Sequence, residues 1–122
     1  MIGYVTVGTN DLKKAGEFYD KLCGELGMGR FMANDRIIVW RGPGGGAGFG
    51  AALPFDGKPM TVGNGVMAAF VAKDRAQVDR IHKLVLSLGG SCEGPPGQRG
   101  ETFYAAYFRD PEGNKLNAFV MG

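Results

Sequence analysis

The sequence is poor in the side chains that usually build metal or redox sites. It contains one histidine, His82, and two cysteines, Cys23 and Cys92, with no Cys-x-x-Cys pair. A catalytic divalent ion takes about three protein ligands from His, Asp, Glu or Cys, held on rigid elements. The isolated cysteines favour reduced, structural thiols, and His82 falls beside the apolar stripe of a predicted helix. We therefore expect no metal centre and no cofactor.

A strong net charge and a long apolar run are also missing. Lys and Arg total 14 against 12 Asp and Glu, and the basic residues are scattered along the chain. This field is too weak to predict binding to nucleic acid or to a membrane surface. No apolar stretch approaches the roughly 20 residues of a membrane helix, and the first residues do not resemble a signal peptide. We expect a cytoplasmic protein without nucleic-acid or membrane partners.

Glycine, by contrast, is abundant, with 22 residues in a chain of 122. Average usage is about 7%. The densest cluster is RGPGGGAGFG, Arg41 to Gly50, which lacks the Gly-Lys-Ser/Thr ending of a phosphate loop and is followed by no amphipathic helix. The cluster is interpreted as a flexible loop between two strands.

The first half of the chain predicts a strand, a helix and further strands. Gly3–Gly8 has the pattern of a short strand, and Asp11 can cap a helix that ends near Gly27. Strands are also predicted at Arg36–Arg41 and Phe49–Leu53. The helix is indicated by apolar residues at spacings of three and four: Leu12, Ala15, Tyr19, Leu22 and Leu26.

The second half begins with the same pattern. A strand is predicted at Val66–Ala72, followed by a helix whose start, Asp74–Gln77, has the form of a capping box. Gly89 and Gly90 end this helix. Its apolar stripe consists of Val78, Ile81, Val85 and Leu88.

The rest of the second half predicts two strands joined by a tight turn. A loop rich in Gly and Pro, GPPGQRG, leads to a strand at Phe103–Arg109. The turn Asp110–Gly113 then leads to a strand at Lys115–Met121. This last strand carries one amide, Asn117, between Leu116 and Ala118. A polar side chain inside an apolar strand is either solvated or part of a site.

A fixed offset of 63 residues supports an internal repeat. It carries Asp11 onto Asp74, Gly27 onto Gly90 and Tyr4 onto Met67. The prediction is one domain of two βαβββ modules over residues 1–122, with modules at about 1–55 and 66–122 and a linker at 56–65. In each module the helix covers one face of the sheet, and the other face is left for a partner module or a ligand.

The residues that carry this pattern resemble a known family. VTVGTNDLKKAGEFYDKL near the start, FRDPEGNKL near the end and the two βαβββ halves resemble the glyoxalase, bleomycin-resistance and dioxygenase superfamily, also called vicinal oxygen chelate proteins. The resemblance spans nearly the whole chain. It implies an α+β fold in which a curved mixed sheet surrounds a cupped pocket, with helices on the outer face. It also implies that a homodimer usually completes the pocket.

The resemblance further implies where metal-dependent relatives hold their ion. The two histidine positions of that pattern are Tyr4 and Met67 here, and its carboxylate position is Asn117. In addition, no acidic residue falls inside a predicted strand. A thioether and two neutral oxygens do not make a site for a hard divalent cation. The expectation is a cup that works without a metal.

The predicted lining of the cup is neutral and partly aromatic. Strand alternation places Tyr4 with Thr6, Ala105 with Tyr107, and Asn117 with Phe119. Trp40 and Phe49 are candidates for its rim or wall. Such a lining suits a small, planar or partly apolar ligand. The candidate ligand-binding residues are Tyr4, Thr6, Trp40, Phe49, Met67, Tyr107 and Asn117.

Three functions remain open from the sequence. The leading prediction is a homodimeric protein that binds a small molecule in a metal-free cup. The alternative is a lyase or isomerase that uses an unidentified metal or tyrosine acid/base chemistry, with Arg99 and Arg109 as the nearest candidate cations. The third is an interaction module whose cup is filled by its own side chains.

Overall fold

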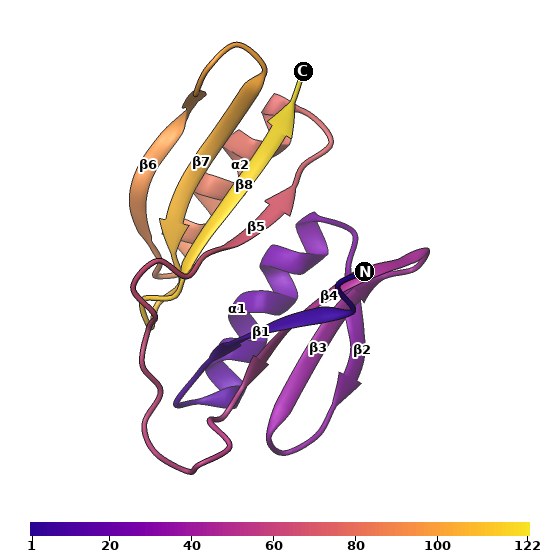
Figure 1. The fold of residues 1–122 in the computed structure, drawn as a ribbon, viewed down its shortest axis with the longest axis vertical. Helices are drawn as coiled ribbons and strands as arrows, with labels where there is room; N and C mark the ends of the chain where they lie inside the picture. Colours follow the sequence, from indigo (N-terminus) through magenta and orange to yellow (C-terminus); the bar gives the residue numbers. More distant parts are fainter. The chain divides into compact units, whose positions relative to one another are not determined.

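The computed structural model describes residues 1–122 and divides them into two compact units. Unit 1 comprises Met1–Thr61 and unit 2 comprises Val62–Gly122 (Figure 1). Each unit contains one helix and one four-stranded sheet. Neither helix is long and apolar enough to cross a membrane.

Unit 1 has the element order strand, helix, three strands. These are β1 (Tyr4–Gly8), α1 (Leu12–Glu25), β2 (Gly29–Ala33), β3 (Ile37–Gly42) and β4 (Gly45–Ala52). The sheet order is β1-β4-β3-β2. Strand β1 pairs with β4 in parallel, and the other pairs are antiparallel.

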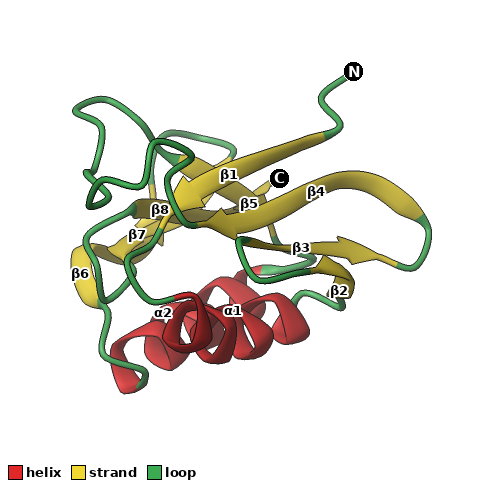
Figure 2. Ribbon diagram, turned by 90° about the horizontal axis from the view of Figure 1, so that it is seen from below, coloured by secondary structure: helices red, strands yellow, loops and turns green.

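Unit 2 repeats this topology. Its elements are β5 (Ala68–Val71), α2 (Arg75–Ser87), β6 (Ser91–Gln98), β7 (Phe103–Arg109) and β8 (Lys115–Met121). The sheet order is β5-β8-β7-β6, again with one parallel pair, β5 with β8. In each unit the helix lies along one face of its own sheet (Figure 2). The predicted α+β fold of two βαβββ modules is confirmed.

The two helices begin in the same way. The Asp11 carboxylate accepts a hydrogen bond from the backbone N–H of Lys14 (3.1 Å), and Asp74 accepts one from Gln77 (2.8 Å). These bonds satisfy N–H groups that have no partner within the helix. Gln77 also reaches back to accept from the N–H of Lys73 (2.9 Å), as its capping-box position predicts.

The two helices also end in the same way. Gly27 follows α1 with φ of 78°, and the N–H of Met28 donates to the carbonyl of Cys23. Gly89 follows α2 with φ of 93°, and the N–H of Gly90 donates to Val85. Both are Schellman endings, which need a left-handed residue that glycine supplies without strain.

The core of unit 1 is aromatic. Tyr19 on α1 packs against Trp40 on β3 and Phe49 on β4, with ring centroids 5.6 and 4.8 Å away. The indole Nε1 of Trp40 donates to a carboxylate oxygen of Asp20 (2.9 Å). Asp20 in turn accepts from two nitrogens of Arg30. This polar edge satisfies the one donor of the buried indole.

The core of unit 2 is mainly aliphatic. Val78, Ile81 and Val85 form the buried stripe of α2, and each is completely buried. Phe108 on β7 and Leu116 on β8 are also completely buried. These three residues of the predicted stripe are therefore in the core, whereas the fourth, Leu88, is the half-buried C-cap of α2.

Two segments predicted as loops are strands. The cluster Arg41–Gly50 falls largely within β3 and β4, with only Pro43 and Gly44 between them. A β-carbon on Gly50 would lie 2.9 Å from the carbonyl oxygen of Ile38, so glycine fits the close strand contact. The stretch GPPGQ belongs to β6, an edge strand with register shifts, where the prolines remove no central hydrogen bond.

Strand β2 was not predicted as an element. It is short and exposed, so its residues show no alternation of buried and exposed positions. It pairs with β3 through a register shift between Arg30 and Met32.

Candidate functional site

The side chains of unit 2 sort onto two faces of its sheet. On the helix side, the Tyr104 hydroxyl donates to Asp79 of α2 (2.6 Å), and Phe108 lies beside His82. Alternation then places Ala105 and Tyr107 on the opposite face. We call the face turned away from a unit's own helix its far face. Tyr107 and Asn117, both predicted ligand-binding residues, lie on the far face of unit 2.

Asn117 lies at the centre of this far face. It pairs directly with Tyr107 on β7 and with Ala69 on β5. The side chain is only 1% exposed, and its Oδ1 atom has no hydrogen-bond partner. An unpaired buried polar atom costs about 1–3 kcal/mol. The amide predicted to belong to a site is therefore buried, with an unused acceptor.

A cavity of about 590 Å³ lies beside Tyr107. Its wall includes Tyr107 together with Arg109 and Lys115, and the segment Val62–Met67 forms the other side. Within that segment the N–H of Val66 donates to the carbonyl of Gly63 (3.3 Å). The volume is in the range of small-molecule sites. Met67 and Tyr107, both predicted ligand-binding residues, are thus brought to one cavity.

Tyr107 is surrounded by basic side chains. The guanidinium carbon of Arg99 lies 5.6 Å from the centre of the Tyr107 ring, and Nζ of Lys115 lies 5.8 Å from it. Arg109 donates to the carbonyl of Gly113 (2.7 Å) and pairs with Glu93 (3.2 Å). The face of an aromatic ring attracts cations at these distances. The surroundings of Tyr107 are therefore basic, where a neutral lining was predicted.

Two glycines of β6 leave room for Arg99 beside Tyr107. A β-carbon on Gly94 would lie 3.1 Å from Nη2 of Arg99 and 3.3 Å from Cδ2 of Tyr107. A β-carbon on Gly97 would lie 2.8 Å from Nη1 of Arg99. Arg99 also donates to the carbonyl of Pro95 (2.8 Å). The Gly- and Pro-rich segment therefore positions the arginine.

The predicted turn at the start of β8 is held by its own aspartate. Oδ1 of Asp110 accepts from the backbone N–H groups of Glu112 and Asn114, and Oδ2 accepts from the Asn114 amide. Gly113 has φ of 99°. Asp110 is buried in this role. The turn is structural, and it fixes the start of β8, the strand that carries Lys115 and Asn117.

The far face of unit 1 is different. Tyr4 and Thr6 pair with Gly48 and Gly50, and β-carbons on these glycines would lie 3.2 Å from the Tyr4 and Thr6 side chains. Tyr4 is 60% exposed. Its open position is consistent with a binding role, but no polar side chain of β4 accompanies it.

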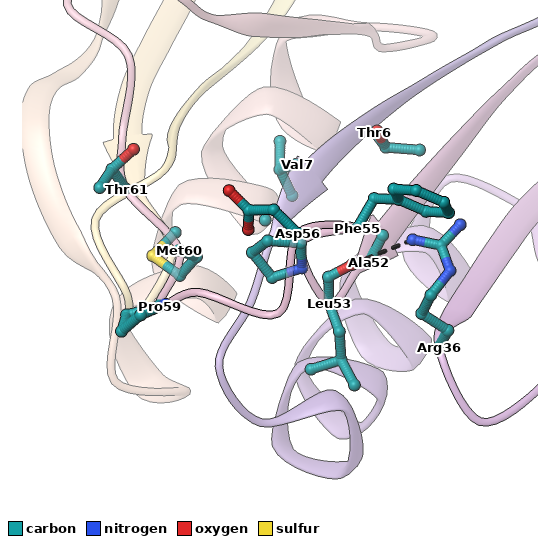
Figure 3. A pocket seen from close by; sticks show the side chains of 12 residues that line it. Thr6, Val7, Arg36, Ala52, Leu53, Phe55, Asp56, Pro59, Met60 and Thr61 are labelled. Carbon is teal, nitrogen blue, oxygen red and sulfur yellow. Dashed lines mark hydrogen bonds between the residues drawn. The ribbon is translucent and has the colours of Figure 1, made fainter.

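A second cavity, of about 420 Å³, lies beside Thr6 in unit 1. Figure 3 shows Arg36 donating to the carbonyl of Leu53 (3.1 Å), with its guanidinium over the Phe55 ring (5.4 Å). Asp56 uses its carboxylate to accept from the N–H of Lys58 (2.9 Å). The two charged side chains of this wall, Arg36 and Asp56, are thus bonded to backbone groups.

Trp40 and Phe49 are core residues of unit 1. Trp40 is completely buried and Phe49 is 3% exposed, and both lie against α1. They were candidates for the rim or wall of the cup. A ligand on the far face of the sheet does not reach them.

The residues at the expected metal positions do not fit a divalent ion. Tyr4, Met67 and Asn117 supply a phenol, a thioether and an amide, which is a poor donor set for a hard cation. No group of three or more His, Cys, Asp or Glu side chains gathers in a way that could hold a metal. His82 instead places its Nε2 atom 3.2 Å from Sγ of Cys92.

The basic residues beside Tyr107 were not among the predicted site residues. Lys115 is two positions before Asn117 in β8, so strand alternation alone places both on one face. Arg99 could not be placed this way, because its position depends on the register shifts of β6. The sequence indicated Arg99 and Arg109 only as the nearest candidate cations for tyrosine acid/base chemistry.

Comparison with known proteins identifies the fold. The profile of the Glyoxalase/Bleomycin resistance protein/Dioxygenase superfamily matches residues 1–118. No curated protein matches the chain. A glyoxalase/bleomycin resistance protein from Albidiferax ferrireducens T118 is 42% identical, with a TM-score of 0.89 over 98% of this chain and 97% of that one.

More distant structures share the fold. A glyoxalase-related enzyme from Fulvimarina pelagi is 19% identical, with a TM-score of 0.78 over 98% of this chain and 86% of that one. A lactoylglutathione lyase from Agrobacterium tumefaciens is 20% identical, with a TM-score of 0.72 over 98% and 92%. Because the profile covers nearly the whole sequence, this chain belongs to the glyoxalase/bleomycin resistance protein/dioxygenase superfamily.

Proposed function

We propose that this protein binds and sequesters a small, partly apolar molecule at the far face of unit 2, without a metal. The observation that carries the proposal is a cavity of about 590 Å³ with Tyr107 in its wall. The strand partner of Tyr107 is Asn117, whose buried Oδ1 atom has no hydrogen-bond partner. A ligand that donates one hydrogen bond to this oxygen would offset its desolvation.

Two residues of the cavity wall suit an apolar body. Met67 supplies a polarisable thioether, and Tyr107 supplies an aromatic ring with a polar end. Neither side chain requires a reacting group on the ligand. Binding by shape, stacking and one amide is therefore sufficient, and no catalytic acid or base is invoked.

Native mass spectrometry of gently purified protein tests the proposal. We expect a bound small molecule in the wild type, and its loss by at least tenfold in Tyr107→Leu and Asn117→Leu. Leu86→Ala is the control, because Leu86 lies exposed on α2. Retention of the molecule in both variants would contradict the proposed site. Conversion of the molecule by the wild type would favour the alternative, an enzyme.

The metal-free part of the proposal has a separate test. Thermal unfolding is measured with stoichiometric Ni²⁺, Mn²⁺ or Zn²⁺ after chelator treatment. We expect no change in Tm. A stabilisation that is lost in Asn117→Ala would contradict the metal-free mode and point to ligation by this side chain.

Assembly as a homodimer remains part of the proposal. Support comes from apolar side chains left exposed on the outermost strands, with Tyr4 60% and Val71 69% exposed. Sedimentation equilibrium gives the mass directly. We expect twice the 13.0 kDa of one chain, and a monomer at all concentrations would contradict this part.

A further inference from the structure

We infer that the ligand of this cavity carries an anionic group, a carboxylate or another compact oxyanion, attached to a planar apolar body. The inference rests on the proposed function and adds the charge of the ligand. It follows from the side chains that gather around Tyr107 and from the absence of an acid in the cavity wall.

The cavity wall is basic. Its ionisable side chains are those of Arg109 and Lys115, together with the phenol of Tyr107, and none of its residues is Asp or Glu. Arg99 adds a third cation beside the Tyr107 ring. One carboxylate, Glu93, pairs with Arg109 from outside the wall. Three cations against one carboxylate leave a positive excess at the site.

Lys115 and Arg99 carry this excess. The salt bridges of unit 2 pair neither of them with a carboxylate. Lys115 places its ammonium 5.8 Å from the centre of the Tyr107 ring, which attracts the charge only weakly. Arg99 uses one nitrogen on the carbonyl of Pro95 and keeps its other donors. Both side chains can therefore donate charge-assisted hydrogen bonds to an anion.

The glycines of β6 support a fixed position for the Arg99 side chain. Gly94 and Gly97 leave the space that the Arg99 guanidinium occupies beside Tyr107. An alanine at Gly97 would place its β-carbon 2.8 Å from Nη1 of Arg99. The arginine is thus held next to the ring by the absence of two side chains. Both cations lie over the Tyr107 ring, so an anion that packs against this residue meets a positive environment.

Three matched probes separate charge from shape. Binding of 2-naphthoate, 2-naphthalenemethanol and 2-naphthylmethylamine is measured by isothermal titration calorimetry. We expect 2-naphthoate to bind about tenfold more tightly than the alcohol, since hydrogen bonds to charged groups exceed neutral ones by about 1.4 kcal/mol, which is tenfold. The amine should bind most weakly.

Variants locate the effect. Lys115→Gln should remove most of the tenfold preference for 2-naphthoate and leave the affinity for the alcohol unchanged. Lys83→Gln, an exposed position on α2, is the matched control and should change neither affinity. Tyr107→Leu should weaken all three probes. If Lys115→Gln does not fold, wild-type binding in increasing NaCl gives the same answer, because only 2-naphthoate should weaken.

The outcomes separate the two proposals. Equal or tighter binding of the alcohol or the amine would overturn the anionic ligand and leave the binding site standing. A preference for 2-naphthoate that survives Lys115→Gln and high salt would overturn the assignment of this preference to the basic side chains. No binding of any probe, together with no molecule in native mass spectrometry, would overturn the binding function itself.

Discussion

The two units share one βαβββ topology and differ in the side chains on the far faces of their sheets. Gly50 of unit 1 pairs with Thr6 and Val39, and Asn117 of unit 2 occupies the matching position between Ala69 and Tyr107. Gly50 has no side chain, whereas Asn117 has a buried amide with an unpaired acceptor. Since the far face does not pack on the helix, it can change without disturbing the core. The proposed binding site therefore lies in unit 2.

The cores of the two units also differ. Unit 1 packs an aromatic group around Trp40, whereas unit 2 packs the aliphatic stripe of α2 against Phe108. Both rely on complete burial of large apolar side chains. The same topology therefore accepts different fillings, as long as the total volume suits the space between helix and sheet.

The largest expected effect tests whether the two cores contribute equally. Phe108→Ala in unit 2 and Phe49→Ala in unit 1 each remove a ring that is at most 3% exposed. We expect each to lower the free energy of unfolding by about 3–5 kcal/mol, because the ring is lost and a cavity remains. Urea denaturation followed by circular dichroism measures the loss. A cost below about 1 kcal/mol for either would break the equivalence of the cores.

The second prediction contrasts the two cysteines, both of which are free thiols. Cys23 of unit 1 is completely buried, and burial raises the pKa of its thiol to about 12. Cys92 of unit 2 is exposed. The thiolate is the form that reacts with a disulfide reagent. At pH 8, Cys23 should therefore react on the order of a thousandfold more slowly than Cys92.

The thiol assay has its controls in two variants. Native protein should show one fast thiol per chain, and Cys92→Ser should abolish it. Cys23→Ser should leave the fast phase unchanged. Two fast thiols in the folded wild type would contradict the buried position of Cys23.

Gly50 of unit 1 lies in a close contact between strands that a larger residue should disturb. Gly50→Ala would bring a β-carbon to 2.9 Å from the carbonyl oxygen of Ile38, which is backbone and cannot move aside easily. We expect a loss of about 1–3 kcal/mol in the free energy of unfolding. Gly24→Ala is the control: a β-carbon there meets no atom within 4 Å, and α1 should gain about 0.5–1 kcal/mol. Unchanged stability in Gly50→Ala would argue against a close strand contact.

The smallest expected effect is the pH dependence that His82 gives to unit 2. Burial lowers the pKa of its imidazole, although the nearby Asp79 carboxylate opposes this. Because the folded state then binds its proton less readily than the unfolded state, stability should be full above about pH 6.5 and fall as pH drops through the folded pKa. Thermal unfolding between pH 7 and 5 measures the slope. His82→Gln should reduce that slope, and an equal slope in both proteins would contradict this role.

The ends of the helices could be predicted because their signals are local. Asp11 and Asp74 cap the nearest N–H groups, and Gly27 and Gly89 adopt the left-handed conformation that ends each helix. These interactions involve residues within five positions of each other. Strand β8 was predicted with its observed bounds, Lys115–Met121, since the Asp110 turn precedes it.

The first part of β4, residues 45–48, and strand β6 were not predicted as strands, because glycine has no side chain to alternate between the faces of a sheet. Their assignment depends on pairing with β3 and β7. Trp40 presented a different difficulty. It belongs to a run of four apolar residues, Ile37–Trp40, that is buried throughout, so its sequence gives no face. Contact with Tyr19 and Asp20 decides that it lies toward α1.

The sequence by itself determined the βαβββ repeat, the helix boundaries and the placement of Asn117 in the last strand, since caps, stripes and turns act over a few residues. Only the tertiary structure decided what surrounds that amide. Strand register places Tyr107 directly opposite Asn117 and brings Arg99 and Lys115 to the Tyr107 ring. Hydrogen bonds between distant strands set this register, so local sequence could indicate Asn117 and Lys115 on one face but not the position of Arg99.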